Sequence, residues 1–252
     1  MDDLEAGGTA DAAIEVDGVT ASCGAGHVIR DLSLHVPRGA VYGLTGPSGA
    51  GKSTLLRILA TLHPPDRGTL RLDGKDPADD LRGARARIGY LPDHFGVYEA
   101  LTAREYLEFF AGLFGVSGRR RRQSAEELLE LFGLAGARDR PVKMLSRGSR
   151  QQLGMARCLV HDPAVLLLDE PAAGMDPEAR LELREVLTEL SRLGKTIVLS
   201  STLLAELAEV ATHLGIMREG RLVADGEVAE LAADGESLDD VFLRVIGESS
   251  AE

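Results

Sequence analysis

The stretch Val41-Tyr-Gly-Leu-Thr45, followed by Gly46-Pro-Ser-Gly-Ala-Gly51-Lys52-Ser53, decides the fold of this chain. The first five residues predict a buried strand, and STLLRILATL (residues 53–62) has the spacing of an amphipathic helix. Between them, glycines allow successive backbone N–H groups to point inward, toward an anion held at the helix N-terminus. The pattern G-x-x-x-x-G-K-[ST] in this context predicts a phosphate-binding loop. The alternative, a chance glycine-rich turn, explains neither the strand nor the helix.

The side chains of this loop indicate which phosphate compound it binds. Lys52 offers a compact ammonium group to β- and γ-phosphates, and the Ser53 hydroxyl is a ligand for Mg²⁺. Lysine is scarce in this chain, with four of the 28 basic residues, so its presence here is informative. We therefore expect ATP and Mg²⁺ to be bound by the phosphate loop, whose residues are Gly46, Pro47, Ser48, Gly49, Ala50, Gly51, Lys52, Ser53 and Thr54.

Apolar runs alternate with helical patterns along most of the chain, which predicts an α/β fold with a mostly parallel sheet. Further strands are expected at IGYLP near Ile88, VLLLDE from Val165 and TIVLSS from Thr196. Residues 95–161 break this alternation with helical spacing alone, so we expect an inserted helical subdomain there. The core is then 13–94 and 162–252, preceded by a mobile tail at 1–12. Near the end, a hairpin and a short amphipathic helix starting at Ser237 are expected.

Charge, cysteine content and hydropathy exclude several classes of protein. A net charge of -12 and a pI near 5.0 argue against nucleic acid as a partner. The two cysteines, Cys23 and Cys158, have no metal-ligand spacing and form no disulfide framework, which indicates a reducing compartment. Neither a membrane-spanning run nor a signal peptide is evident. A cytoplasmic chain is expected, held at a membrane only by a partner.

Two carboxylates follow the apolar run Val165–Leu168. Asp169 and Glu170 are then expected at the carboxyl edge of the sheet, where ligands of open α/β sheets bind. Asp169 would hold the Mg²⁺ shell, and Glu170 would be the general base that orients the attacking water. A helix cap or solvated strand end is the common alternative for one such pair, but the phosphate loop makes it the minor interpretation.

Two further segments complete a set of linked motifs: Leu145-Ser-Arg-Gly148-Ser-Arg-Gln151 and Gly174-Met-Asp176-Pro177. The order of the phosphate loop, LSxGxxQ, LLLDEP and this last segment resembles the ATP-binding cassette (ABC) transporter ATPases, over nearly the whole chain. The resemblance implies a P-loop NTPase (RecA-like) core with the helical subdomain and a peripheral antiparallel β region.

The same resemblance implies two partners. One is a second ATP-binding subunit, identical or related, arranged head to tail. Ser146 and Gly148 would then contact the γ-phosphate bound on the other subunit, and Asp176 would help to link the two sites. The other is a separate transmembrane permease, which would place this chain on the inner face of the cell membrane. GYLPDHFGVYEALTAREYLEFF, the LSRG variant and the ending SLDDVFLRVIG resemble drug and efflux exporters in particular.

Three positions depart from the family pattern. Cys23 stands where an aromatic residue usually stacks on adenine, and Asp93 replaces the glutamine that links the Mg²⁺ site to the permease. Asp93 keeps an oxygen ligand. At the switch position Thr202 replaces a histidine, so charge-assisted donation to the γ-phosphate is lost and slow turnover is predicted.

Alternatives remain open. The chain could be a catalytically weak or regulatory nucleotide-binding subunit, because Thr202 replaces the switch histidine. A cassette ATPase with no role in transport is a further alternative. The basic run Arg119–Arg122 is typical of a solvated loop, with contact to anionic lipid or a partner as the lesser interpretation. His94, His161 and His213 are expected to be structural or exposed, His94 being the one nearest the site.

Overall fold

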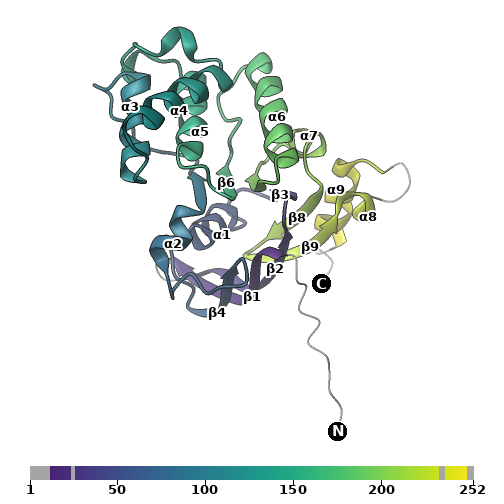
Figure 1. Ribbon diagram of the computed structural model, residues 1–252. Coiled ribbons are helices and arrows are strands. Elements are labelled where there is room, and N and C mark those ends of the chain that lie inside the picture. The colour runs from purple at the N-terminus through teal and green to yellow at the C-terminus, as the bar shows by residue number, and fades with distance from the viewer. Residues whose placement is uncertain (1–11, 24–25, 233–235, 249–252) are drawn as a thin grey trace.

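The computed structural model describes residues 12–23, 26–232 and 236–248 of the chain (Figure 1). Most of the predicted tail, residues 1–12, lies outside the described part. Ala12 is described and belongs to the first strand. Nothing is described of the side chain of Cys23, the predicted adenine position.

A six-stranded sheet forms the centre of the molecule (Figure 1), in the order β5-β6-β7-β3-β8-β9. The first five run parallel, and β9 pairs antiparallel with β8, which confirms the mostly parallel sheet and the late hairpin. Its strands are β3 (Val41–Thr45), β5 (Ile88–Leu91), β6 (Val165–Asp169), β7 (Thr196–Ser200), β8 (His213–Arg218) and β9 (Arg221–Glu227).

A second sheet is antiparallel and lies beside the first at the lower edge of Figure 1, in the order β2-β1-β4. Its strands are β1 (Ala12–Cys23), β2 (Gly26–Pro37) and β4 (Arg67–Leu72). This sheet is the expected peripheral antiparallel β region.

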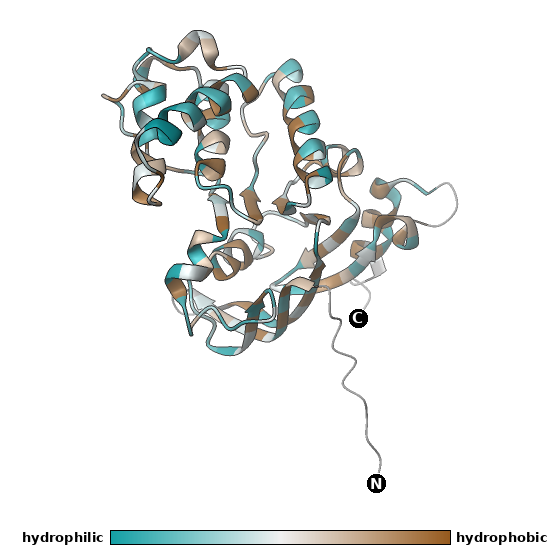
Figure 2. Cartoon of the chain, viewed as in Figure 1, coloured by the Kyte–Doolittle hydropathy of each residue, from teal (hydrophilic) through white to brown (hydrophobic). Residues whose placement is uncertain are grey.

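Two hydrophobic cores lie on opposite faces of the central sheet. Along β6, Val165 and Leu167 belong to one core, and Leu166 and Leu168 to the other, as the two-residue period of a strand requires. Because both faces are covered, the strand is apolar throughout, and Figure 2 shows the central strands in brown while the helices alternate brown and teal.

Helix α1 packs into the core that the two sheets share, and α3 to α7 contribute to the core on the other face. Helices α3, α4 and α5 gather at the upper left of Figure 1, between β5 and β6 in the chain order. The helices are α1 (Lys52–Leu59), α2 (Leu81–Ala86), α3 (Ala103–Leu113), α4 (Gly118–Leu131), α5 (Arg147–Leu159), α6 (Pro177–Arg192), α7 (Leu204–Ala208), α8 (Val228–Leu231) and α9 (Leu238–Glu248), with 3-10 turns at Ala135–Ala137 and Val142–Met144.

Local hydrogen bonds explain where several helices begin. At α9, the Asp240 backbone N–H donates to Ser237 Oγ at 3.2 Å and the Ser237 N–H donates to Asp240 Oδ2 at 3.1 Å, the predicted capping pair. At α3, Thr102 and Glu105 form a capping box that was not predicted. One prediction was wrong: Arg119–Arg122 lie in the first turns of α4 and not in a loop.

The helices of the described part of the chain include none with the length and apolar character of a bilayer-spanning segment.

Candidate nucleotide-binding site

Four parallel strands place many of the predicted site residues, though not all of them, at one edge of the sheet. Strands β3, β5, β6 and β7 share their direction, so the segments that follow them meet at the same carboxyl edge. They meet around a cavity of about 240 Å³. Its lining residues are Val28, Ser48, Gly49, Ala50, Gly51, Lys52, Ser53, Thr54, Asp93, Asp169, Glu170 and Thr202.

Backbone geometry explains why the phosphate loop is rich in glycine. Gly46 has a φ of +146°, and a Cβ there would lie 2.1 Å from the carbonyl oxygen of Met217 in β8. Gly51 has a φ of +107° and caps α1 at its N-terminus, where helix N–H groups are free to bind an anion. The β8–β9 turn supports the loop from behind, because the Gly220 N–H donates to the Ala50 carbonyl oxygen at 2.9 Å.

Lys52 is held close to the loop that it follows. Lys52 is buried, with 8% of its surface exposed. Its Nζ donates to the carbonyl oxygens of Gly46 at 2.7 Å and Pro47 at 3.3 Å. Burial lowers the pKa of Lys52, and the charges of Glu170 and Asp169 act in the opposite direction. Gly46 and Pro47 do not line the cavity; their carbonyl groups position the lysine from behind.

Ser200, at the end of β7, fixes both acidic residues. Its Oγ donates to Asp169 Oδ1 at 2.7 Å and also accepts from the Glu170 backbone N–H at 3.1 Å. Gln151 of α5 donates from Nε2 to the Glu170 carbonyl oxygen at 3.3 Å. Glu170 has a φ of +49°, a left-handed conformation that costs a non-glycine residue free energy and that these contacts hold in place.

The environment of Glu170 suits a base. Burial raises the pKa of Glu170, Lys52 lowers it, and the nearby carboxylates of Asp169 and Glu206 raise it further. A hydrogen bond from the Thr202 backbone acts to lower it. The net direction is upward, toward the range in which a carboxylate accepts a proton near neutral pH.

The oxygen atoms around the cavity are those that Mg²⁺ prefers. Ser53, Asp93 and Asp169 line it together, and hydroxyl and carboxylate oxygens are hard ligands. Among the described residues, no cluster of three or more His, Cys, Asp or Glu could hold a metal by itself. Mg²⁺ is usually bound by one or two carboxylates and completes its shell with substrate phosphates. Asp93 is half-exposed, and its Oδ2 lies 2.9 Å from His94 Nδ1.

Ser146, Gly148 and Asp176 lie outside this cavity. Ser146 caps α5 by accepting from the Ser149 N–H at 3.0 Å, and Asp176 caps α6 by accepting from the Ala179 N–H at 2.9 Å. Both caps are exposed. They belong to one surface, since a Cβ on Gly148 would lie 3.4 Å from the carbonyl oxygen of Gly174.

Three further residues belong to the site but were not predicted from the sequence: Val28, Gln151 and Ser200. Ser200 and Gln151 belong to segments that the motifs had already singled out, TIVLSS and LSRGSRQ, so their positions gave a usable signal. Val28 gave none, because it lies in β2, far from the loop along the chain.

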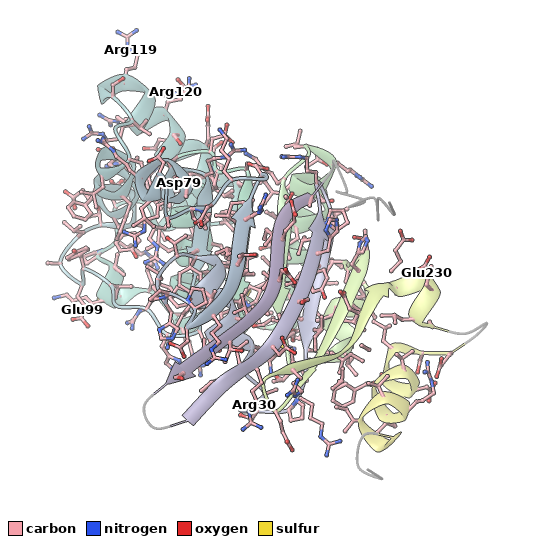
Figure 3. All side chains as sticks on the ribbon, turned by 90° about the horizontal axis from the view of Figure 1, so that it is seen from below. Arg30, Asp79, Glu99, Arg119, Arg120 and Glu230 are labelled. Atoms are coloured by element: carbon pink, nitrogen blue, oxygen red, sulfur yellow. The ribbon has the colours of Figure 1, made fainter. Side chains whose placement is uncertain are left out.

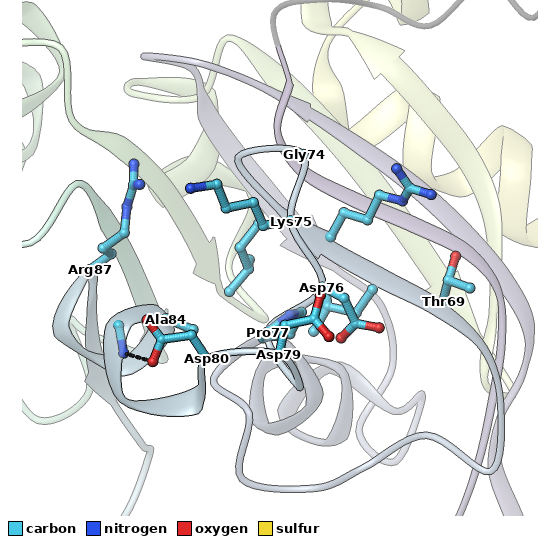
Figure 4. Close-up of a pocket in the computed structure, with 13 residues that line it drawn as sticks. Thr69, Gly74, Lys75, Asp76, Pro77, Asp79, Asp80, Ala84 and Arg87 are labelled. Atoms are coloured by element: carbon cyan, nitrogen blue, oxygen red, sulfur yellow. Dashed lines mark hydrogen bonds between the residues drawn. The ribbon is translucent and has the colours of Figure 1, made fainter.

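A larger hollow of about 510 Å³ lies between β4 and α2 (Figure 4). Its wall carries cationic side chains from Arg71, Lys75 and Arg87, and Asp80 Oδ1 accepts from the Gly83 N–H at 2.8 Å. It contains none of the predicted site residues and none of the loops at the carboxyl edge of the central sheet, so the smaller cavity is the candidate site.

The raised pKa of Glu170 leads to a stability prediction. A carboxylate whose folded pKa is raised destabilises the folded state once it ionises, and has no effect below its ordinary value of 4.5. Glu170→Gln should therefore raise the free energy of unfolding of the nucleotide-free chain at neutral pH. The difference should shrink as the pH falls and vanish below the ordinary value, in urea unfolding followed at several pH values.

The exposed Glu185 of the same acidic chain provides the matched control, because Glu185→Gln removes a charge without a buried carboxylate. Equal gains for the two variants, or a gain for Glu170→Gln that persists at acid pH, would contradict this account of the site.

Comparisons with known proteins agree with the geometry. The family model described as ABC transporter matches residues 29–173. A daunorubicin resistance ATP-binding protein of Streptomyces coeruleorubidus is 40% identical over 96% of this chain and 77% of its own length. A Nod factor export ATP-binding protein of Paraburkholderia xenovorans is 41% identical over 88% of this chain and 73% of its own.

Solved structures show the same arrangement. An ATP-binding subunit of an ABC transporter has a TM-score of 0.85 and 28% identity, covering 93% of this chain and 99% of that one. A dimeric ATP-binding cassette in a post-hydrolysis state with ADP and Pi has a TM-score of 0.79 and 25% identity, covering 85% and 98%. The chain thus has the P-loop NTPase fold, and it belongs to the ABC transporter family as one of its ATP-binding, ATP-hydrolysing cassettes.

Proposed function

We propose that this chain hydrolyses Mg-ATP in a pair of ATP-binding subunits and so drives export through a separate membrane permease. One observation carries the proposal: Lys52, Ser53, Asp93, Asp169 and Glu170 line a single cavity at the carboxyl edge of the sheet. Export is supported by the names of the relatives, which concern daunorubicin resistance and Nod factor export.

In the proposed reaction the protein mainly positions charges. The phosphate loop and Lys52 bind the β- and γ-phosphates, and Glu170 orients a water molecule and accepts its proton. Ser53, Asp169 and Asp93 would hold Mg²⁺, which neutralises charge on the phosphates when bound. Ser200 and Gln151 keep Glu170 in the one backbone conformation that directs it into the cavity.

A second ATP-binding subunit fits the exposed surface formed by Ser146, Gly148 and Asp176. These residues lie at the N-termini of α5 and α6 and close to one another, yet outside their own cavity. A helix N-terminus can bind an anion, so we place the γ-phosphate of the partner subunit here. The relative solved as a dimer supports this pairing. Identical and related partner subunits both remain compatible with it.

For the permease we propose a groove of about 230 Å³ between the end of α1, β5, α3 and α5. It is largely apolar, and exposed side chains surround it, with Leu62 57% and Phe114 44% exposed. Phe114 stacks on His161 with 3.7 Å between ring centroids, so a rigid wall is already formed. A helix of a membrane partner, inserted here, would hold the chain on the inner face of the membrane.

The segment that carries Thr202 is firmly anchored on one side. Ser201 Oγ donates to Glu206 Oε2 at 2.7 Å and accepts from the Leu203 N–H at 3.0 Å, and Arg180 of α6 lies 3.5 Å from Glu206. Thr202 lines the cavity on this anchored segment. A side chain introduced at this position would therefore face the site without rearrangement of the backbone.

Hydrolysis of Mg-ATP by the purified chain is the direct test of the proposed function. Lys52→Ala should abolish both ATP binding and turnover, whereas Glu170→Gln should retain ATP binding and lose turnover by at least about a hundredfold, as expected for loss of a general base. Turnover that survives Glu170→Gln would rule out the assigned base. ATP binding with no turnover in the unmodified chain would instead favour the regulatory alternative that Thr202 raises.

Thr202→His is expected to raise the turnover number on the order of tenfold, because an imidazole can donate a charge-assisted hydrogen bond to the γ-phosphate. Thr202→Gln is the matched control, since it adds reach and a donor without charge. Steady-state hydrolysis at saturating Mg-ATP measures both. An unchanged or lower rate for Thr202→His would mean that Thr202 is sufficient.

Leu62→Asp should release the chain from washed membranes of the native cell, because a charge in the groove opposes an apolar partner helix. The control is Leu193→Asp. Leu193 lies at the end of α6 and is 68% exposed. Immunoblotting of the membrane and soluble fractions compares them. Retention of Leu62→Asp on membranes to the level of the control would remove this groove as the docking site.

A further inference from the structure

Four consecutive arginines, Arg119–Arg122, open helix α4 and form a patch of positive charge, the arginine patch. Figure 3 shows Arg119 and Arg120 projecting outward, away from the rest of the molecule. Arg121 Nε donates to the Val116 carbonyl oxygen at 3.0 Å, which fixes its stem against the preceding turn. In the described part of the chain, Arg119, Arg120 and Arg122 are exposed, and their side chains form no ion pair or hydrogen bond.

Residues near the arginine patch in the sequence do not neutralise its positive charge. No Asp or Glu occurs from Phe109 to Ala125, although the chain as a whole has a net charge of -12. The first acidic residue beyond it, Glu126, is engaged with Arg104 at 3.1 Å. The first turn of α4 contains no acid, and Ser117 makes no side-chain cap, so the positive end of the helix dipole adds to the charge.

Exposed apolar side chains lie immediately before the arginines. Leu113, at the end of α3, is 67% exposed, and Phe114 is 44% exposed. A cationic cluster beside exposed aliphatic and aromatic groups combines the two features that bind a bilayer interface, electrostatic attraction and shallow apolar insertion.

We propose that the arginine patch, with Leu113, contacts the anionic headgroups of a lipid bilayer. This inference rests on the proposed function in one respect: Phe114 lines the proposed permease groove, so a permease seated there would bring the membrane beside α4. Guanidinium groups bind phosphate oxygens in a bidentate manner and remain charged at any physiological pH. The permease would set the position of the cassette, and the patch would set its tilt against the membrane.

The overall negative charge of the chain does not prevent this contact. At about 0.1 M salt the Debye length is about 10 Å, so carboxylates on distant faces are screened while side chains at the headgroups are not. An arginine near an anionic surface strengthens binding by roughly fivefold. Loss of the three exposed arginines should therefore weaken binding by roughly a hundredfold.

Vesicle cosedimentation of the purified, full chain tests the proposal without the permease. The probes are vesicles of phosphatidylcholine alone and of phosphatidylcholine with phosphatidylglycerol, at about 0.1 M salt. The test variant replaces Arg119, Arg120 and Arg122 with Gln. The control replaces three exposed arginines on β4 and β9, Arg67, Arg71 and Arg221, with Gln, which changes the net charge equally. Leu113→Ser tests the apolar contribution and is expected to weaken binding severalfold.

We expect the unmodified chain and the control to bind the anionic vesicles and not the neutral ones, and the test variant to lose that binding. Mg-ATP hydrolysis should be equal in all of these chains, which separates this result from a failure of the proposed function. No binding to anionic vesicles by the unmodified chain, or equal loss in test and control variants, would overturn the proposal. The first of these outcomes would point to an acidic protein segment as the partner of the patch.

Discussion

The structure depends on the parallel alignment of β5, β6, β7 and β3. Parallel strands end at the same edge, so four segments that are far apart in the chain deliver their polar residues to one place. Lys52 follows β3 and Asp169 ends β6, and β7 lies between these two strands. The two residues lie near one cavity only because the strands run parallel and end at the same edge. The apolar faces of the strands fix the alignment, since a slip of one residue would move every side chain to the wrong core.

Several contacts hold the site in a form that is unfavourable without a ligand. Glu170 is ionised with difficulty because it is partly buried beside Asp169 and Glu206, and its backbone is left-handed. Lys52 is also partly deprived of water, and its ammonium group relies on two carbonyl oxygens of the loop. Both features are acceptable in a site that binds a polyanion with its metal, because the ligand supplies the missing opposite charges. The same packing that destabilises the empty site thus prepares it for phosphoryl transfer.

The sequence predicted the parts of this arrangement that are local. The strand, the glycine turn and the helix of the phosphate loop are adjacent, so their pattern was readable, as was the apolar run that ends in Asp169 and Glu170. Contacts across the sheet were not readable in this way. Ser200 could be found in a motif, but its bonds to Asp169 and Glu170 follow from the neighbouring positions of β6 and β7. The arginines were wrongly placed in a loop, because four like charges have no apolar period and only Ala125, Leu128 and Leu129 of α4 anchor the helix to the core.

The loss of the histidine at Thr202 has a structural setting that limits its consequences. A histidine at this position would supply a hydrogen-bond donor. The backbone of the segment is held by contacts of Ser201, Glu206 and Arg180, and none of these contacts involves the side chain at position 202. The Thr202 backbone also acts to lower the pKa of Glu170, against the raising effect of burial. Under the proposed function, threonine in place of histidine would remove a hydrogen-bond donor and leave the position of Glu170, the proposed general base, intact. Under the proposed function, such a site would retain the machinery for hydrolysis and lose part of the stabilisation of charge, which would lower the rate without abolishing the reaction.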